Sequence, residues 1–264
     1  MDQVDRDVVL ALFDREMRRE VPPEGSGVRV ERADDVVLQT GDWNAVVWSC
    51  LDEAGADAAI AAQVRHFTAL GVEFEWKHYG HDRPADLAER LRAAGFVPEP
   101  AETLMVAPVA ALSTEVRPPD GVRLAPVTGA AGAELLVRAH EEAFGEVRPE
   151  MGRQLLDRLT REPDTVVAVV ALAGDRPVSG ARIELTPGVA FAGLWGGGTA
   201  PAWRGRGVYR ALVAYRARVA AERGYRYLQV DASDQSRPIL GRLGFTPMTT
   251  TTPYIYQPRR VLEE

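Results

Sequence analysis

The residues best suited to chemistry in this 264-residue chain form the run Pro201–Arg210, Pro-Ala-Trp-Arg-Gly-Arg-Gly-Val-Tyr-Arg. Gly205 and Gly207 let the backbone approach a ligand closely, with its amide N–H groups pointing outward. A helix that begins here adds the positive end of its dipole, and Arg204 and Arg206 add positive charge. This combination predicts a binding site for a phosphate or pyrophosphate group. The alternative is an ordinary strand-to-helix turn with two solvated arginines.

The segments on either side of this run would position it. The preceding segment, Phe191 to Ala200, is extended, and its three consecutive glycines suit a strand that splays and admits a ligand backbone. The following segment has helical periodicity. Its apolar face holds Val208, Ala211, Leu212, Tyr215 and Val219, and its polar face holds Arg210, Arg216, Arg218 and Glu222. We therefore expect a strand, a tight turn and a helix in succession.

Composition narrows the classes of function. The chain is 46% hydrophobic and 26% charged, which is typical of a soluble globular protein with one large or two small domains. The net charge of −7 argues against a general nucleic-acid-binding surface. Cys50 is the only cysteine, which excludes an intrachain disulfide and a cysteine metal cluster. We expect a cytoplasmic monomer or homodimer with no membrane, nucleic-acid or metal partner, since no apolar run reaches ~18 residues and no signal-peptide pattern is present.

A proline-containing segment, residues 107–121, separates two halves that share a spacing pattern. The pattern Leu-x-x-x-Gly-Phe-x-Pro occurs at Leu91–Pro98 and again at Leu240–Pro247. Upstream of each copy, Gly71–Trp76 resembles Gly224–Gln229, and each reads as a helix end followed by a strand. We interpret the pattern as an internal duplication, and coincidence between two α/β segments is the alternative.

The two halves differ at the phosphate-binding run. The first half carries Asp52, Glu53 and Asp57 at the corresponding helix start, and carboxylates at a helix N-terminus repel a phosphate. We therefore expect a degenerate domain over residues 1–110, which packs against the other and contributes a wall of its acceptor pocket. The ligand-binding domain is expected over residues 120–264.

The order of elements in the second half predicts its sheet. Three consecutive strand-like segments precede the Val208 helix, and this helix then leads to a strand near Tyr225–Asp231. Consecutive strands favour antiparallel pairing, whereas a strand reached through a helix favours parallel pairing. The pattern predicts the α/β (α+β) class, with mixed, mostly antiparallel sheets flanked by helices.

The spacing Arg204-x-x-Gly207-x-Tyr209, preceded by Pro201, resembles the R/Q-x-x-G-x-G/A pyrophosphate loop of the GNAT acyltransferase superfamily. The order of elements from Val122 to Gln257 is also similar to that family. The resemblance implies two GNAT-like sheets and acetyl-CoA as co-substrate. It also implies cofactor-binding roles for Gly197, Gly198, Thr199, Arg204, Gly205, Arg206, Gly207, Val208 and Tyr209. The Walker and dinucleotide motifs fit worse.

The chain departs from this family at the positions that commonly hold the general base and acid. Gly193 and Trp195 stand at the base positions, and Leu240 stands at the tyrosine acid position. Trp195 is expected to line the acceptor pocket. The replacement candidates for catalysis are Ser233, Asp231, Glu184 and Glu142, and each could instead be an ordinary capping or surface residue. Catalysis by water-mediated base action or by proximity is a further possibility.

The sequence therefore predicts an N-acetyltransferase that transfers an acetyl or other acyl group from acetyl-CoA to an amine of a small molecule or peptide. In the same interpretation, only the second half binds CoA. The alternative is a catalytically inactive CoA-binding sensor or scaffold protein, which the missing acid and base residues favour.

Overall fold

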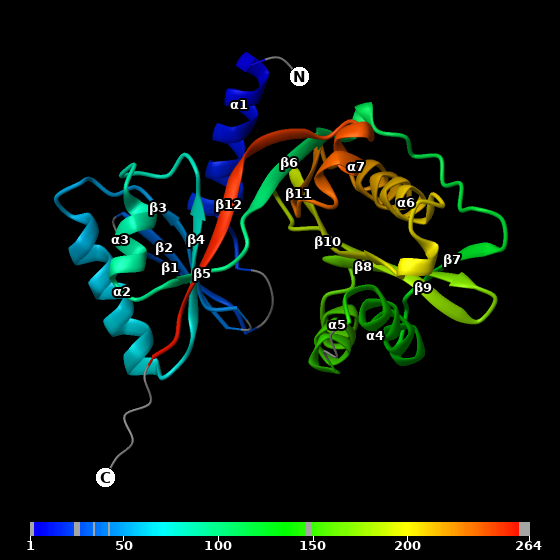
Figure 1. The fold of residues 1–264 in the computed structure, drawn as a ribbon, viewed down its shortest axis with the longest axis horizontal. Coiled ribbons are helices and arrows are strands. Elements are labelled where there is room, and N and C mark those ends of the chain that lie inside the picture. The colour runs from blue at the N-terminus through cyan, green and yellow to red at the C-terminus, as the bar shows by residue number, and fades with distance from the viewer. Residues whose placement is uncertain (1–2, 24–26, 34, 42, 146–148, 259–264) are drawn as a thin grey trace, which may run out of the picture. The chain divides into compact units, whose positions relative to one another are not determined.

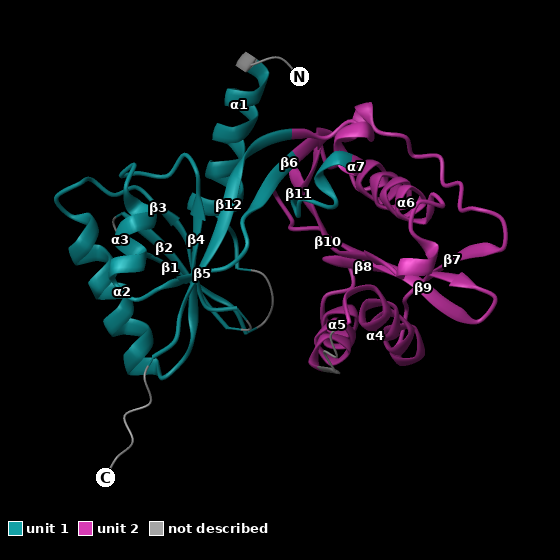
Figure 2. Cartoon of the chain, in the orientation of Figure 1, with its two compact units in different colours: residues 1–105, 231–238, 247–264 teal, residues 106–230, 239–246 magenta. Residues whose placement is uncertain are grey.

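The computed structural model describes residues 3–23, 27–33, 35–41, 43–145 and 149–258. The chain forms two compact units, shown in different colours in Figure 2. The first unit comprises residues 1–105, 231–238 and 247–264, and the second comprises residues 106–230 and 239–246. Within the described ranges, no helix combines the length and apolarity needed to cross a membrane.

The first unit is built on a sheet with strand order β1-β2-β3-β4-β12-β6, and β5 also pairs with β12. Strands β3 and β4 are parallel, whereas β1–β2, β2–β3 and β4–β12 are antiparallel. Helices α2 and α3 cover one face (Figure 1), where Ile60, Phe67 and Trp76 are buried. The elements are α1 (Gln3–Phe13), η1 (Asp14–Arg19), β1 (Arg29–Ala33), β2 (Val36–Thr40), β3 (Ala45–Ser49), α2 (Ala56–Leu70), β4 (Phe74–Tyr79), α3 (Leu87–Ala93), β5 (Val97–Pro98), β6 (Glu102–Pro108) and β12 (Thr246–Tyr256).

The second unit has the strand order β6-β11-β10-β9-β8-β7. Pairing is antiparallel from β7 to β10, and parallel between β10 and β11, on either side of the helix that connects them. Helices α4 and α5 lie on one face of this sheet and α6 on the other (Figure 1). The elements are η2 (Val109–Ala111), β7 (Val122–Pro126), α4 (Ala130–Phe144), α5 (Pro149–Arg161), β8 (Val166–Ala173), β9 (Arg176–Glu184), β10 (Phe191–Thr199), η3 (Pro201–Trp203), α6 (Val208–Glu222), β11 (Tyr227–Ala232) and α7 (Arg237–Arg242). The expected mixed, mostly antiparallel sheet with flanking helices is confirmed.

The two units do not follow the two sequence halves at their ends. Strand β12, the last of the chain, pairs with β4, with Thr251 opposite Tyr79 and Tyr256 opposite Phe74. Residues 247–264 therefore group with the first unit, although a domain of residues 120–264 is expected from the sequence. The end of β6, from the first half, groups with the second unit beside β11. A strand's side-chain pattern specifies which face is buried, but not which sheet edge the strand joins.

The shared sequence pattern corresponds to shared local structure. Phe96 N–H donates to Leu91 C=O, and Phe245 N–H donates to Leu240 C=O, both at 3.1 Å. Gly95 and Gly244, which precede the two phenylalanines, both have positive φ, of 96° and 106°. Such a residue after a helix ends it by bonding its last carbonyls, which is why glycine is required in both copies.

Candidate active site

Strands β10 and β11 separate beyond a short paired region. Their parallel pairing extends only from Phe191 opposite Tyr227 to Gly193 opposite Gln229. Strand β10 then continues to Thr199, with β9 paired along its other edge. From Leu194 onward, the edge of β10 that faces away from β9 has no strand partner in the described part of the chain. Backbone N–H and C=O groups on such an edge are able to bond an extended ligand.

The glycines of β10 produce a bulge along this open edge. The pairing register with β9 shifts between Trp195 and Gly198, and Gly196 has a φ of 60°. A Cβ atom at Gly198 would lie 2.4 Å from the Phe144 ring of α4, so only glycine fits there. The bulge bends the strand and gives its backbone groups a direction that a regular strand lacks.

The run after β10 forms the expected turn and helix start. The 3₁₀ turn η3 is followed by Gly205 and Gly207, whose φ angles of 73° and 90° lie in the left-handed region. Gly207 is the N-cap of α6, and the buried Val208 is its first residue. Ala211 N–H donates to Gly207 C=O at 3.0 Å, so the amides of the first turn precede the first helical hydrogen bond. These amides and the helix dipole form a site for an anion.

The arginines of this loop have different surroundings. Arg204 Nε donates to Thr199 C=O at 3.0 Å, and its Nη2 donates to Ala143 C=O at 2.9 Å. Arg204 therefore ties the loop to the ends of β10 and α4. The guanidinium of Arg206 lies 5.0 Å from the centre of the Trp203 ring, and Arg206 and Arg210 are both exposed. Arg206 and Arg210 are thus better placed than Arg204 to meet a phosphate.

Two residues of α6 lie close to Gly197 in β10. A Cβ at Gly197 would lie 3.0 Å from Cε2 of Tyr209 and 3.6 Å from Nη2 of Arg216. The expectation that Arg216 lies on the polar face of this helix is wrong, because the residue is only 1% exposed. Its place with Arg210, Arg218 and Glu222 on the helical pattern suggested a solvated face, whereas the long side chain contacts β9 and β10.

Trp195, the expected acceptor-pocket residue, lies in the bulge and is 38% exposed. The guanidinium of Arg182 lies 5.8 Å from the centre of its ring. The indole Nε1 lies near Gly193, where an added Cβ would come within 2.7 Å of it. Trp195 is therefore an exposed aromatic surface beside the last paired residues of β10 and β11.

Two of the four carboxylate or hydroxyl candidates are held in ion pairs of the second unit. Glu184, opposite Gly193 in β9, accepts from Arg158 at 2.8 Å and from Arg182 at 3.0 Å. Glu142 of α4 accepts from both Nε and Nη2 of Arg176. Paired carboxylates of this kind are weak bases, because the arginine charge favours the ionised form.

The other two candidates, Ser233 and Asp231, belong to the first unit. Ser233 lies in an exposed turn, where its Oγ is 3.3 Å from Ser236 Oγ. Asp231 is the fifth residue of β11, two beyond Gln229, and its Oδ2 is 2.5 Å from Nζ of Lys77. Its other oxygen, Oδ1, is buried and has no hydrogen-bond partner among the described residues.

A carboxyl group that sequence reasoning missed interacts with this pair. Burial raises the pKa of Glu102 in β6 to about 7, and the charge of Asp231 acts in the same direction while Lys77 opposes it. Lys77 has its own pKa raised, because the charges of Asp231, Tyr79 and Glu75 outweigh its burial. No sequence motif marks Glu102 as a functional residue, because it lies at the start of a strand among residues of no recognised motif. In the described ranges, no group of histidine, cysteine or acidic residues could hold a metal ion.

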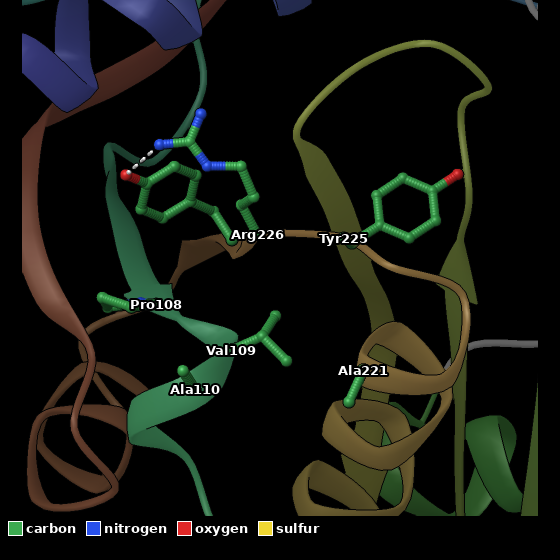
Figure 3. Close-up of a pocket in the computed structure, with 7 residues that line it drawn as sticks. Pro108, Val109, Ala110, Ala221, Tyr225 and Arg226 are labelled. Carbon is green, nitrogen blue, oxygen red and sulfur yellow. Dashed lines mark hydrogen bonds between the residues drawn. The ribbon is translucent and has the colours of Figure 1, made fainter.

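A pocket of about 440 Å³ lies elsewhere in the second unit, between the end of α6 and η2 (Figure 3). It is lined by Pro108, Val109, Ala110, Ala221, Tyr225, Arg226 and Tyr227. The phosphate loop is at the opposite end of α6, which spans about 22 Å over its 15 residues. This pocket is therefore separate from the loop and from the bulge of β10.

Comparison with known proteins identifies a similar family and similar folds. Residues 133–245 match the model of the acetyltransferase (GNAT) family. A GCN5-related N-acetyltransferase from Kribbella flavida has a TM-score of 0.68 at 20% identity, and the match covers 95% of this chain and 93% of that one. A GCN5-related N-acetyltransferase from Sphaerobacter thermophilus has a TM-score of 0.60 at 15% identity, with coverage of 89% and 84%.

A tandem GNAT protein from the clavulanic acid biosynthesis pathway is also similar in structure. Its TM-score is 0.60 at 16% identity, and the match covers 97% of this chain and 94% of that one. At such identities the structural likeness concerns the fold, and it extends over both units. A search of curated proteins returned no match.

Proposed function

We propose that this chain, whose residues 133–245 match the model of the acetyltransferase (GNAT) family, transfers an acetyl group from acetyl-CoA to an amine of a small molecule or peptide. One observation carries the proposal. The unpaired edge of β10 leads directly into a loop whose glycines, Gly205 and Gly207, hold left-handed conformations at the start of α6. An extended ligand with a pyrophosphate at one end matches both features.

The residues proposed to hold the donor are those expected from the sequence, with an altered role for Arg204 and with Arg210 added. The amides of residues 205–209 bind the pyrophosphate, and Arg206 and Arg210 add charge from exposed positions. The backbone from Gly197 to Thr199 bonds the pantetheine arm. Arg204 keeps the loop in place through Thr199 and Ala143 instead of contacting the phosphate. A Cβ at Gly205 would meet nothing within 4 Å, so the space over the loop is open.

The chemistry follows from this placement. The donor supplies a thioester, whose carbonyl carbon the neutral acceptor amine attacks; the C–N bond forms, the C–S bond breaks, and the amine loses a proton. A backbone N–H in the bulge of β10 would stabilise the negative charge that develops on the carbonyl oxygen. The exposed ring of Trp195 would contact the acceptor. Holding the two reactants together supplies a large part of the rate enhancement.

The general base is not assigned to any of the four candidates. Glu184, Glu142 and Asp231 are each held in an ion pair, which favours the ionised and weakly basic form, and Ser233 lies in an exposed turn of the other unit. Water-mediated base action and proximity are therefore the proposed route. Leu240, at the position of the usual acid, is fully buried in apolar surroundings and donates no proton.

Release of free thiol from acetyl-CoA tests the proposal. The purified protein is incubated with acetyl-CoA and a panel of amines, aminoglycosides, amino acids and peptides. We expect at least one acceptor to raise thiol release above the hydrolysis measured without acceptor. Binding of acetyl-CoA with no turnover of any acceptor would support the inactive sensor or scaffold instead.

A further inference from the structure

The side chain of Arg216, in the third turn of α6, is a buried cation that pairs with no carboxylate of the described residues. It is 1% exposed, and its Nε donates to Leu212 C=O of its own helix at 3.1 Å. Its Nη1 makes a long contact of 3.4 Å with Arg182 C=O of β9. Its Nη2 has no hydrogen-bond partner in the described part of the chain. Two of the three guanidinium nitrogens therefore face protein carbonyls, and the third does not.

The unpartnered Nη2 lies close to Gly197 in the bulge of β10. It would be 3.6 Å from a Cβ at Gly197, the glycine at the centre of the bulge. Tyr209, from the first turn of the same helix, also lies close to Gly197, since its Cε2 would be 3.0 Å from the same Cβ. Burial lowers the pKa of Arg216, and the charge of Tyr209 together with its side-chain interaction with the guanidinium opposes this effect. Arginine remains charged under such conditions, so a positive charge is fixed beside the edge that the donor is proposed to occupy.

The protein fold does not require this charge. A buried guanidinium without a counter-charge loses its hydration and receives little in return, and an apolar side chain of similar length would pack equally well. An unsatisfied buried donor is also unusual in a native structure and calls for an explanation. A ligand oxygen at this edge would satisfy it, because hydrogen bonds from a charged donor are the stronger class.

The position along the helix indicates which part of the donor is involved. Arg216 lies eight residues after Val208, or about 12 Å along the helix axis from the start of α6. Its side chain leans back toward the helix N-terminus, as long side chains in helices do. The pyrophosphate would occupy the helix start. The group at Arg216 is therefore the amide-containing pantetheine arm.

We infer that Arg216 is a donor-binding residue, whose Nη2 donates a hydrogen bond to a carbonyl oxygen of the pantetheine arm at the Gly197 bulge. The inference rests on the proposed function, because it assumes that an acyl-CoA occupies the open edge of β10. It goes further by assigning recognition of the arm to a buried side chain, in addition to the strand backbone and the phosphate loop. The phosphate loop and Arg216 would then bind two different parts of one ligand.

Calorimetric titration with CoA and with ADP separates these two parts. ADP carries the adenosine and the pyrophosphate but lacks the pantetheine arm, so it reports on binding without that arm. We expect Arg216→Met to raise the Kd for CoA about tenfold while the Kd for ADP stays within about twofold of the wild type. Arg216→Lys, which keeps the charge but loses the planar fork, should fall between the two. Arg218→Met is the matched control, since Arg218 lies on the same helix and is 46% exposed.

Thermal unfolding of the same variants distinguishes a ligand-binding role from a structural one. Arg216→Met should unfold at or above the wild-type temperature, because it removes a buried charge. The inference is overturned if Arg216→Met binds CoA as tightly as the wild type, or if it loses CoA and ADP affinity to the same extent. A wild-type protein that binds neither ligand would instead refute the proposed function, and this inference with it.

Discussion

At the residue scale, the arginines show most clearly what a sequence pattern leaves open. Arg204 matches the first position of the pyrophosphate motif, yet its guanidinium is occupied by the carbonyls of Thr199 and Ala143. Arg216 fits the polar face of a helix, yet it is buried. Helical periodicity gives the direction in which a Cα–Cβ bond points, but a long arginine side chain can reach in several directions from there. The site's backbone was predictable, and the partners of its charged side chains were not.

Exchanging Arg204 and Arg206 for alanine, one at a time, should distinguish a residue that holds the loop in place from one that binds the donor. Arg204→Ala should lower the free energy of unfolding by about 1–2 kcal/mol, because it removes two charge-assisted hydrogen bonds that join the loop to β10 and α4. Arg206→Ala should leave stability unchanged and weaken acetyl-CoA binding by roughly fivefold, or about 1 kcal/mol. Urea unfolding and calorimetry measure the two effects. If Arg204→Ala instead weakens acetyl-CoA binding and Arg206→Ala lowers stability, then Arg204 contacts the phosphate.

Glu102 makes the stability of the protein depend on pH in a predictable direction. Its pKa is about 7 in the folded protein, against an ordinary value near 4.5, chiefly because it is buried. The folded state therefore binds more protons than the unfolded state between these two values, and the stability that depends on Glu102 falls as the pH rises through this window. The stability of Glu102→Gln relative to the wild type should therefore be greater at pH 8 than at pH 5. An equal difference in unfolding temperature at both pH values would contradict this.

At the scale of elements, the strand–loop–helix succession follows from local chemistry and was predictable. Gly205 and Gly207 supply left-handed residues, and Val208 starts a helix of the expected length. The repeated Leu-x-x-x-Gly-Phe pattern likewise specifies the same helix end in both units. The point where β10 and β11 separate was not predictable in detail, because the pairing of parallel strands depends on residues distant in sequence.

The loop can be tested with two glycines that have similar conformations. Gly207→Glu places a side chain and a negative charge in the proposed phosphate site, at a φ of 90°. Gly174→Glu places the same side chain at a φ of 60° in the turn between β8 and β9, where an added Cβ meets nothing within 4 Å. Each variant should lose roughly 1–2 kcal/mol of stability from the left-handed conformation.

Only the Gly207 variant should also lose affinity for acetyl-CoA, by more than about tenfold, because carboxylate and phosphate repel each other. Thermal shift with and without acetyl-CoA reports both quantities in one experiment. If the two variants respond equally to the ligand, the phosphate site lies elsewhere.

At the scale of the whole molecule, the grouping of β12 with the first unit is the feature furthest from the sequence-based expectation. The duplication suggests two self-contained domains, but residues 231–238 and 247–264 group with the first unit. Each half supplies a final strand with similar spacing, so the sequence is compatible with either arrangement. Only the pairing of β12 with β4, including Tyr254 opposite Trp76, distinguishes them.

A fragment of residues 115–264 should therefore fail to fold stably. It keeps β12 but lacks β4 and β5, the strands with which β12 pairs, and it also lacks β6, which borders β11. Exposed strand edges and apolar side chains such as Tyr254, which is 2% exposed in the full chain, favour aggregation. Size-exclusion chromatography and circular dichroism test this. A monomeric fragment as stable as the full chain would contradict it.

The difference between the two units also sets the expected stoichiometry. Asp52 and Asp57 lie at the start of α2 in the first unit, where the second unit has its phosphate loop. Asp52 accepts from Gly55 N–H at 2.6 Å, and Asp57 pairs with Arg90. These carboxylates lie where a second phosphate would bind, and their charge would repel it. One chain should therefore bind one acetyl-CoA.

Titration of the full-length protein with acetyl-CoA in a calorimeter tests the central claim most directly. The claim is that the open edge of β10 and the loop of residues 204–209 form a single acyl-donor site. We predict saturable binding of one acetyl-CoA per chain, abolished or weakened more than about tenfold by Gly207→Glu and retained by Gly174→Glu. No binding at millimolar acetyl-CoA, or two equivalents bound per chain, would contradict the account.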